Sequence, residues 1–213
     1  MSTSSVDLAS LLCSRLCHDL LSPVGALVNG LELLADEKDP EMRQRCMELL
    51  EQSAQTSTDK LKFFRLAFGA AGGFGDTVPA EEVRSLVDAL VENNDRITIT
   101  WVLGVAEMSK PAAKVLLNFA QLAIDALVRG GEIDVAAEVR NGTSELAVRA
   151  AGPKIAFDEA IGRAINGTMP EADLSSRTAA AHMLFLLAEQ CGGGLQYAVS
   201  DEALVLGAVL PQG

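Results

Sequence analysis

The amino-acid sequence predicts an α+β protein, built from an N-terminal antiparallel helical hairpin and a C-terminal α/β domain with helices on one face of a mixed sheet. Apolar residues recur at helical spacing through the first third of the chain, and a glycine-rich stretch, "GAAGGFGD", follows at 69–76. Beyond it, helix-like stretches alternate with strand-like ones. We therefore assign 1–70 to the hairpin, 71–78 to a glycine-rich linker and 79–213 to the second domain.

The first helix is expected over residues 5–35, and its apolar side chains recur every three or four positions. Asp39-Pro40-Glu41 then marks a turn and a restart, because proline loses nothing in a first helical turn and acids favour a helix N-terminus. The second helix is expected to reach Phe68. Two helices joined by so short a turn lie antiparallel. The apolar side of the first helix comprises Leu12, Leu16, Leu20, Val24, Leu27, Leu31 and Leu34.

A lone hairpin cannot bury both faces of its apolar stripes. Pairing two hairpins about a two-fold axis gives a four-helix bundle, and we therefore expect a homodimer. The alternative is that the hairpin packs against the rest of its own chain.

The second domain is expected to alternate helices and strands, with Asn141-Gly142 as a strong hairpin-turn signal between two strands. The helices are expected at 81–92, 110–129, 157–165 and 175–190. The strands are expected at 96–102, 133–140, 144–150, 195–199 and 204–210.

Composition narrows the classes of partner. The 213 residues are 49% hydrophobic, and 17 basic against 29 acidic residues give a formal net charge of -12. Binding to nucleic acid or to an anionic membrane is thereby disfavoured, and proteins are the expected partners. The chain shows no export signal at its start and no uncharged apolar run of spanning length, so we expect a cytoplasmic protein.

The four cysteines are expected to be reduced thiols without a redox role. Cys13, Cys17 and His18 have ligand chemistry, but three residues separate the cysteines where haem attachment needs two. No second Cys/His pair stands at a zinc-site spacing. We expect no bound metal.

His18 stands out on the first helix. At 100° per residue, Ser14, Ser22, Gly25 and Asn29 fall within about 40° of it, so a polar face of small side chains leaves the ring open to another protein. An imidazole is nucleophilic at neutral pH and can carry a phosphoryl group. The other histidine, His182, lies in "AAAHMLFLL" and is expected to be structural.

The residues that follow His18 suit such chemistry. Asp19 can accept the other ring proton and fix the tautomer, and Ser22 can orient that hydrogen bond. Pro23 removes a backbone donor and so leaves the carbonyl of Asp19 free.

"HDLLSP" (18–23) resembles the phosphoacceptor box of sensor histidine kinases, which lies on a dimerisation and phosphotransfer hairpin. The second domain resembles the ATP-binding domain of those kinases, with departures. "LLNFAQLAIDAL" has Leu122 where the Mg²⁺-holding asparagine stands, and "VRAAGPKI" has Ala150 for the adenine-reading aspartate and Lys154 for a glycine. No glycine remains at 178–181, where a glycine-rich lid is expected. We therefore expect no ATP binding and no cofactor of its own.

The whole chain resembles the ChpT family of histidine phosphotransferases. The resemblance implies reversible phosphoryl transfer from the receiver aspartate of a CckA-like hybrid kinase to His18, and on to CtrA-like or CpdR-like response regulators, with Mg²⁺ supplied by the receiver.

The resemblance also implies roles for the residues around the box. His18 is the expected nucleophile, and Asp19 and Ser22 orient it. Arg15 is a candidate charge for the phosphoryl group or the receiver, and Ser14, Gly25 and Asn29 form docking surface. An active histidine kinase and a dimeric scaffold in which His18 is idle remain the alternatives.

Overall fold

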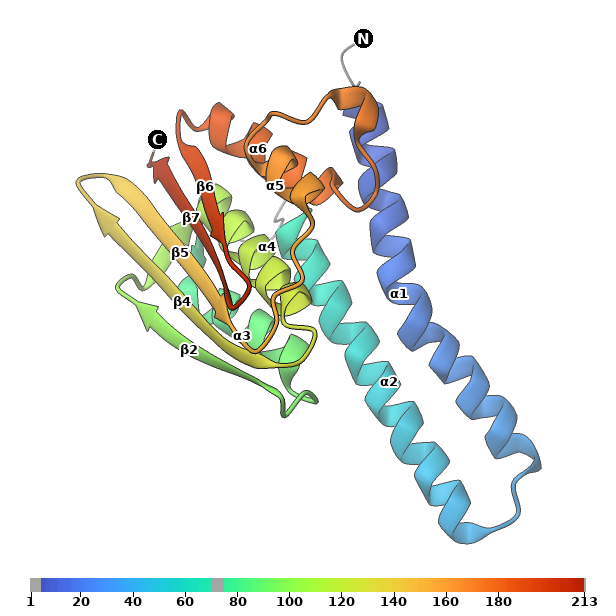
Figure 1. The fold of residues 1–213 in the computed structure, drawn as a ribbon. Helices are drawn as coiled ribbons and strands as arrows, with labels where there is room; N and C mark the ends of the chain where they lie inside the picture. The colour runs from blue at the N-terminus through green and yellow to red at the C-terminus, as the bar shows by residue number, and fades with distance from the viewer. Residues whose placement is uncertain (1–4, 70–74, 213) are drawn as a thin grey trace.

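The computed structural model describes residues 5–69 and 75–212. Helices α1 (Ser5–Asp36) and α2 (Pro40–Ala67) form the expected antiparallel hairpin. One half of the hairpin lies against the second domain, and the end that carries the α1–α2 turn projects away from it (Figure 1).

The second domain is a five-stranded mixed sheet with helices on one face, as expected (Figure 1). The strand order is β2-β4-β5-β7-β6, in which β2 and β4 are parallel and every other neighbouring pair is antiparallel. The strands are β2 (Ile97–Leu103), β4 (Gly131–Arg140), β5 (Thr143–Ala151), β6 (Gly194–Val199) and β7 (Ala203–Pro211). The helices are α3 (Ala80–Val91), α4 (Lys110–Ala126), α5 (Glu159–Ile165), the short 3₁₀ helix η1 (Glu171–Asp173) and α6 (Ala179–Gln190).

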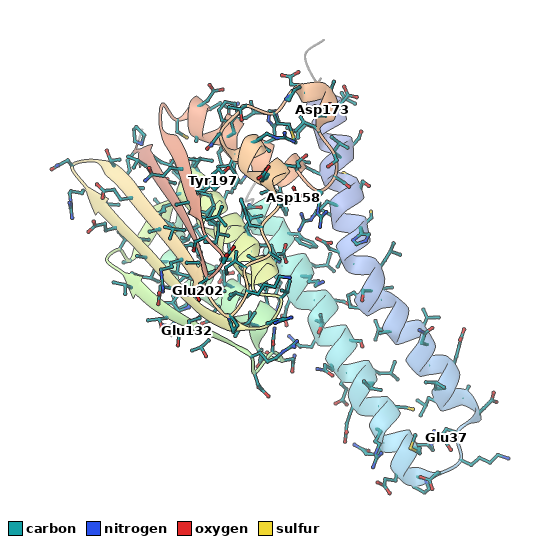
Figure 2. All side chains as sticks on the ribbon, viewed as in Figure 1. Glu37, Glu132, Asp158, Asp173, Tyr197 and Glu202 are labelled. Carbon is teal, nitrogen blue, oxygen red and sulfur yellow. The ribbon has the colours of Figure 1, made fainter. Side chains whose placement is uncertain are left out.

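The two turns expected from the sequence form for local reasons. Asp39 caps α2, because its side chain accepts hydrogen bonds from the backbone N–H groups of Glu41 and Met42 at 3.0 Å. Figure 2 places Glu37 beside this turn, at the far end of the hairpin. Asn141 and Gly142 both have positive φ angles, as a two-residue turn between β4 and β5 requires.

Some predicted boundaries are wrong. Residues 70–74, which include the first half of the predicted linker at 71–78, lie outside the described residues. The linker does not extend to residue 78, because β1 (Thr77–Pro79) pairs antiparallel with β3 (Glu107–Ser109) in a small second sheet. Helix α4 ends at Ala126 rather than at residue 129, and α6 begins at Ala179 rather than at residue 175.

The end of α2 belongs to the core of the second domain. Phe63 and Ala67 are fully buried and Leu66 is nearly so, within the same apolar cluster as α4 and the sheet. Helix α1 also packs against α6. The hairpin therefore uses its own chain as a partner over part of its length, and a boundary drawn at residue 70 does not separate two cores.

The remaining hairpin surface keeps an exposed apolar stripe on α1, which we call the α1 stripe: Leu21, Val24, Val28 and Leu31. These residues are spaced three and four apart and share one side of the helix. Leu16, Leu20, Leu27 and Leu34 are only partly exposed. Of the predicted apolar side, Val24 and Leu31 belong to the α1 stripe, and Leu21 and Val28 lie outside that prediction.

Among the described residues, α1 is the one helix whose length and hydropathy would suffice to cross a membrane. It carries Arg15, His18 and Asp19 along its length, and Arg15 and Asp19 are ion-paired there.

Candidate functional site

His18 lies near the middle of α1 with 87% of its side chain exposed. Its Nδ1 is 3.2 Å from Oδ1 of Asp19. A proton on Nδ1 is then donated to that carboxylate, which leaves the lone pair of Nε2 free. The exposed ring thus presents a nucleophilic nitrogen to solvent.

Asp19 is held from two sides. Arg15, one turn earlier, donates from Nε to Oδ2 of Asp19 at 3.1 Å. Lys60 of α2 donates from Nζ to the backbone carbonyl of Asp19 at 3.0 Å. That carbonyl lies four residues before Pro23, which has no N–H to offer it, so the expectation of a free acceptor is confirmed and Lys60 uses it.

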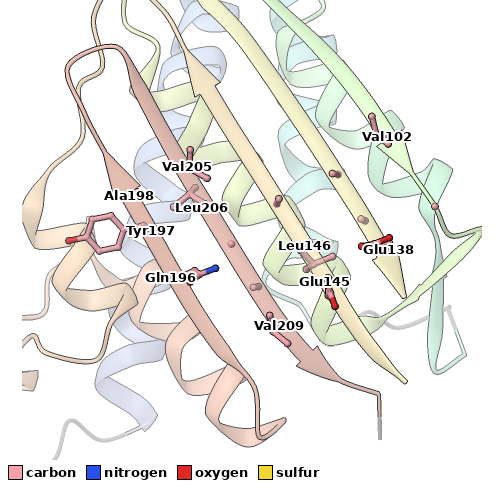
Figure 3. A pocket seen from close by; sticks show the side chains of 16 residues that line it. Val102, Glu138, Glu145, Leu146, Gln196, Tyr197, Ala198, Val205, Leu206 and Val209 are labelled. Atoms are coloured by element: carbon pink, nitrogen blue, oxygen red, sulfur yellow. The ribbon is translucent and has the colours of Figure 1, made fainter. Parts of the chain in front are cut away.

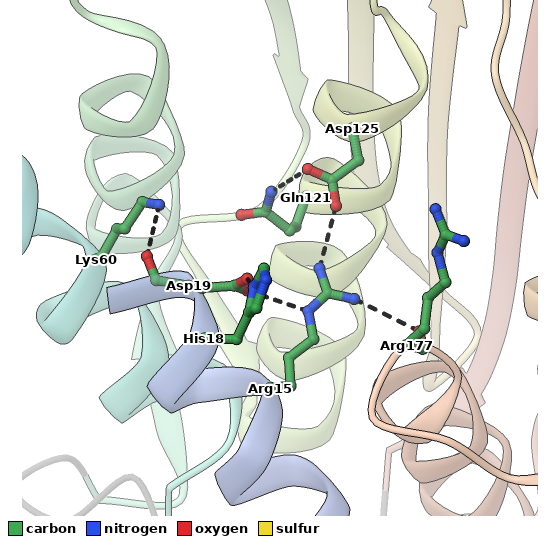
Figure 4. A network of polar contacts seen from close by, with 7 residues as sticks. All are labelled: Arg15, His18, Asp19, Lys60, Gln121, Asp125 and Arg177. Carbon is green, nitrogen blue, oxygen red and sulfur yellow. Dashed lines mark hydrogen bonds and ion pairs between the residues drawn. The ribbon is translucent and has the colours of Figure 1, made fainter. Parts of the chain in front are cut away.

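Arg15 links α1 to the second domain (Figure 4). Its Nη2 donates to Oδ2 of Asp125 on α4 at 3.2 Å, and its Nη1 lies 3.5 Å from the carbonyl oxygen of Arg177, just before α6. Only 19% of its side chain is exposed. The guanidinium proposed as a charge for an incoming phosphoryl group is therefore engaged by its own chain.

Asp125 has an unusual environment. Gln121, one turn earlier on α4, donates from Nε2 to its Oδ1 at 2.8 Å. Desolvation by the surrounding protein raises the pKa of Asp125 above the ordinary 3.8, although 46% of the side chain is exposed, and Arg15 and Gln121 oppose that rise. No motif in the sequence indicates Asp125, which stands three residues after Leu122 in the helix compared with the kinase asparagine box.

These groups lie beside a cleft of about 770 Å³ between α1 and the second domain. Its walls carry three carboxylates and two guanidinium groups. The lining residues are Arg15, His18, Asp19, Asp125, Ala156, Phe157, Asp158, Ile161, Ser176 and Arg177. Arg177, with 72% of its side chain exposed, is 3.5 Å from Asp158.

The other predicted site residues lie on the open face of α1. Ser14, Ser22 and Asn29 are exposed, and a Cβ built on Gly25 would have no neighbour within 4 Å. Within the described chain, no hydrogen bond joins Ser22 to His18 or Asp19, so its orienting role stays a prediction. His182 is buried and its ring lies beside that of Phe185, with the two ring centres 6.0 Å apart, in agreement with a structural role.

A second hollow, of about 720 Å³, lies on the helix-free face of the sheet (Figure 3). Its floor is formed by small residues, among them Ala136, Ala147 and Gly207, and Glu138 and Glu145 stand at one side. None of the predicted site residues lines it. The cleft beside His18 is therefore the candidate site.

Two positions compared with the kinase nucleotide site carry apolar, buried side chains. Leu122 and Ala150 are buried in the apolar core. The cavity that Leu122 lines with Phe63 and Phe64 measures about 20 Å³, room for roughly one water molecule. An apolar side chain in such a cavity offers neither a metal ligand nor a phosphate donor.

Known proteins match this chain along its length. A family model for the histidine phosphotransferase C-terminal domain matches residues 80–203. The protein phosphotransferase ChpT of Brucella abortus (strain 2308) is 31% identical over 205 residues, which cover 96% of each chain. The chain belongs to the ChpT family of histidine phosphotransferases.

Solved structures agree with membership of the ChpT family. A bacterial phosphotransferase solved at 1.7 Å matches with a TM-score of 0.84 and 29% identity over 98% of both chains. The histidine kinase domain of the blue-light-activated kinase EL346 from Erythrobacter litoralis has a TM-score of 0.53 and 12% identity over 90% of this chain. At that identity the likeness is one of fold: this ChpT-family chain has the architecture of a histidine kinase core.

Proposed function

We propose that this phosphotransferase is a relay in a multistep phosphorelay, carrying a phosphoryl group on His18 between receiver domains without binding ATP. The donor is the receiver aspartate of a CckA-like hybrid kinase, and the acceptors are CtrA-like or CpdR-like response regulators. The observation that carries the proposal is an 87% exposed imidazole whose Nδ1 is 3.2 Å from the Asp19 carboxylate.

In the proposed step, the Nε2 lone pair of His18 attacks the phosphorus of the aspartyl phosphate. The N–P bond forms as the P–O bond to the aspartate breaks, and the carboxylate leaves with the bonding electron pair. The Nδ1 proton stays with the ring, where Asp19 accepts its hydrogen bond and stabilises the positive charge that develops. Mg²⁺ held by the receiver would neutralise the phosphoryl oxygens. The same step in reverse transfers the phosphoryl group from Nε2 of His18 to the receiver aspartate of an acceptor.

Independence from ATP is supported by the second domain. Leu122, Ala150 and Lys154 stand where the kinase pattern has polar or glycine residues. Around the cleft, Asp19, Asp125 and Asp158 outnumber Arg15 and Arg177, which disfavours a triphosphate.

A homodimer is supported by the α1 stripe. Leu21, Val24, Val28 and Leu31 are between 45% and 68% exposed and continue along about three turns of α1. A second copy placed about a two-fold axis would cover the stripe with its own counterpart. A charged protein whose helix α1 is paired in this way fits the cytoplasm.

The test follows a radioactive phosphoryl group. The purified protein is incubated with radiolabelled ATP alone, and separately with a radiolabelled phosphorylated receiver domain from a CckA-like kinase. We expect label on the protein only from the receiver, no label on His18→Ala, and onward transfer when an unlabelled CtrA-like receiver is added. His182→Gln, which changes the other histidine, is the matched control and should keep the label.

Each alternative gives a different result. Label from ATP alone would establish an active histidine kinase. Absence of label from every receiver tried, with a dimer that folds normally, would establish the scaffold.

A further inference from the structure

We propose that Asp125 of α4 is a positioning residue for phosphoryl transfer, acting on His18 through Arg15 and Asp19. The inference rests on the proposed function and gives the second domain a part in it.

Four contacts in series connect α4 to the imidazole (Figure 4). Gln121 donates to Oδ1 of Asp125 at 2.8 Å, and Arg15 Nη2 donates to Oδ2 of Asp125 at 3.2 Å. Arg15 Nε donates to Oδ2 of Asp19 at 3.1 Å, and His18 Nδ1 is 3.2 Å from Oδ1 of Asp19. Along this chain of contacts, each carboxylate oxygen meets one donor.

The His18 ring is oriented because each carboxylate oxygen of Asp19 has a different partner. Arg15 occupies Oδ2, so Oδ1 is the oxygen that remains for His18 Nδ1. A carboxylate without Arg15 can rotate about its terminal torsion and reach other partners, because such torsions have broad minima. Holding one oxygen therefore favours one imidazole tautomer, with the proton on Nδ1 and the reactive pair on Nε2.

Asp125 is what holds Arg15 in that position. An arginine side chain loses rotamer entropy when it is fixed, and a single exposed pair along one helix does not offset that loss. Here the guanidinium is a bridge between helices, with Asp19 on one side and Asp125 on the other. The remaining groups that face it are the Arg177 carbonyl and, across the cleft, Asp158.

The experiment removes the contact between Arg15 and Asp125 by substituting Asp125. Asp125→Ala and Asp125→Glu are compared with wild type for the single-turnover rate of transfer between His18 and a receiver, measured across pH 5.5–9. The tautomer of the His18 ring is read in parallel from its side-chain nitrogen NMR signals in the free protein.

The matched control is Asp134→Asn on β4. Asp134 pairs with Arg149 at 3.0 Å and is 50% exposed, close to the 46% of Asp125, but it lies on the sheet and has no link to His18.

We expect Asp125→Ala to slow transfer on the order of tenfold. Losses of this size are usual when a residue that orients a functional imidazole through hydrogen bonds is removed. We also expect it to shift the His18 signals toward the Nε2-protonated tautomer and to change the pH profile of the rate. Asp125→Glu should restore part of the rate, and Asp134→Asn should match wild type in all three measurements.

The inference is overturned if wild type transfers normally and Asp125→Ala keeps its rate, its pH profile and its His18 spectrum. Failure of wild type to accept a phosphoryl group from any receiver overturns the proposed function instead, and the inference with it.

Discussion

At the scale of single residues, the His18 ring contacts a carboxylate whose two oxygens each have a partner. Asp19 meets His18 with one oxygen and Arg15 with the other, and its backbone carbonyl binds Lys60. The carboxylate is therefore fixed in position and in orientation before any partner arrives.

Asp19→Asn should slow transfer through His18 by about a hundredfold or more, the range found when an orienting carboxylate becomes an amide. Arg15 would bind the amide oxygen, so the amide N–H₂ group would face Nδ1 and favour the wrong tautomer. Single-turnover transfer from a labelled receiver measures the effect. Asp134→Asn, the same change at a carboxylate on β4 that pairs with Arg149, is the control and should keep the wild-type rate. A wild-type rate for Asp19→Asn would contradict the assignment.

The pKa of Asp125 offers a second test. Desolvation raises it above 3.8 while Arg15 lowers it, so Arg15→Ala should raise the pKa further. A carboxyl whose pKa is raised by folding contributes stability below its unfolded pKa, and that stability is lost as pH rises through the folded value. Carbon NMR titration of the Asp125 carboxyl measures its pKa in folded wild type and in folded Arg15→Ala. A midpoint that falls in Arg15→Ala would show that the guanidinium does not act on Asp125.

At the scale of elements, the two long helices differ in which parts are exposed and which are buried. The middle of α1 presents an open polar face around His18, while the last turn of α2 is part of the core of the second domain. Substitutions on the two elements should separate docking from stability.

Gly25→Ala should stabilise the protein by about 0.5–1 kcal/mol, because an interior helical glycine is replaced and the new Cβ meets nothing within 4 Å. Gly25→Trp should fold equally but hinder an approaching receiver, so we expect weaker receiver binding on the order of tenfold. Thermal unfolding and a receiver-binding titration measure the two effects. Unchanged receiver affinity in Gly25→Trp would remove Gly25 from the docking surface.

Phe63→Ala should lower the free energy of unfolding by about 3–5 kcal/mol, the usual cost of emptying a fully buried aromatic site. Because Phe63 lies on α2 but packs in the core of the second domain, hairpin and domain should unfold together. Chemical denaturation followed by circular dichroism and by Trp101 fluorescence tests this. Arg65→Ala, exposed on the same turn, is the control, and non-coincident transitions would argue against a single unit.

At the scale of the whole molecule, the proposed homodimer rests on the exposed α1 stripe. Val28→Glu places a charge in the middle of the stripe and should convert a dimer to a species near 22.4 kDa by light scattering. Asn29→Glu, which places the same charge on the face of α1 that carries His18, should leave the mass unchanged. A wild-type mass near one chain would remove the basis for the dimer.

The sequence predicted the features that local signals control. The periodicity of α1, the Asp39 cap and the Asn141-Gly142 turn each depend on residues close together in the chain. The Arg15–Asp125 bridge joins residues 110 positions apart, and no local pattern contains it. The short strands β1 and β3 were missed for a similar reason, since three residues carry no periodicity and only their pairing defines them.

The anchoring of α2 in the second domain has a consequence for the kinetics of the proposed relay. Buried side chains at the end of α2 and the Arg15 bridge fasten the second domain to the hairpin at two places. In the proposed relay, each arrival and each departure of a phosphoryl group is then a collision between two separate proteins, not a movement within one. Each transfer step would then have a rate proportional to the concentrations of the two proteins that meet in it.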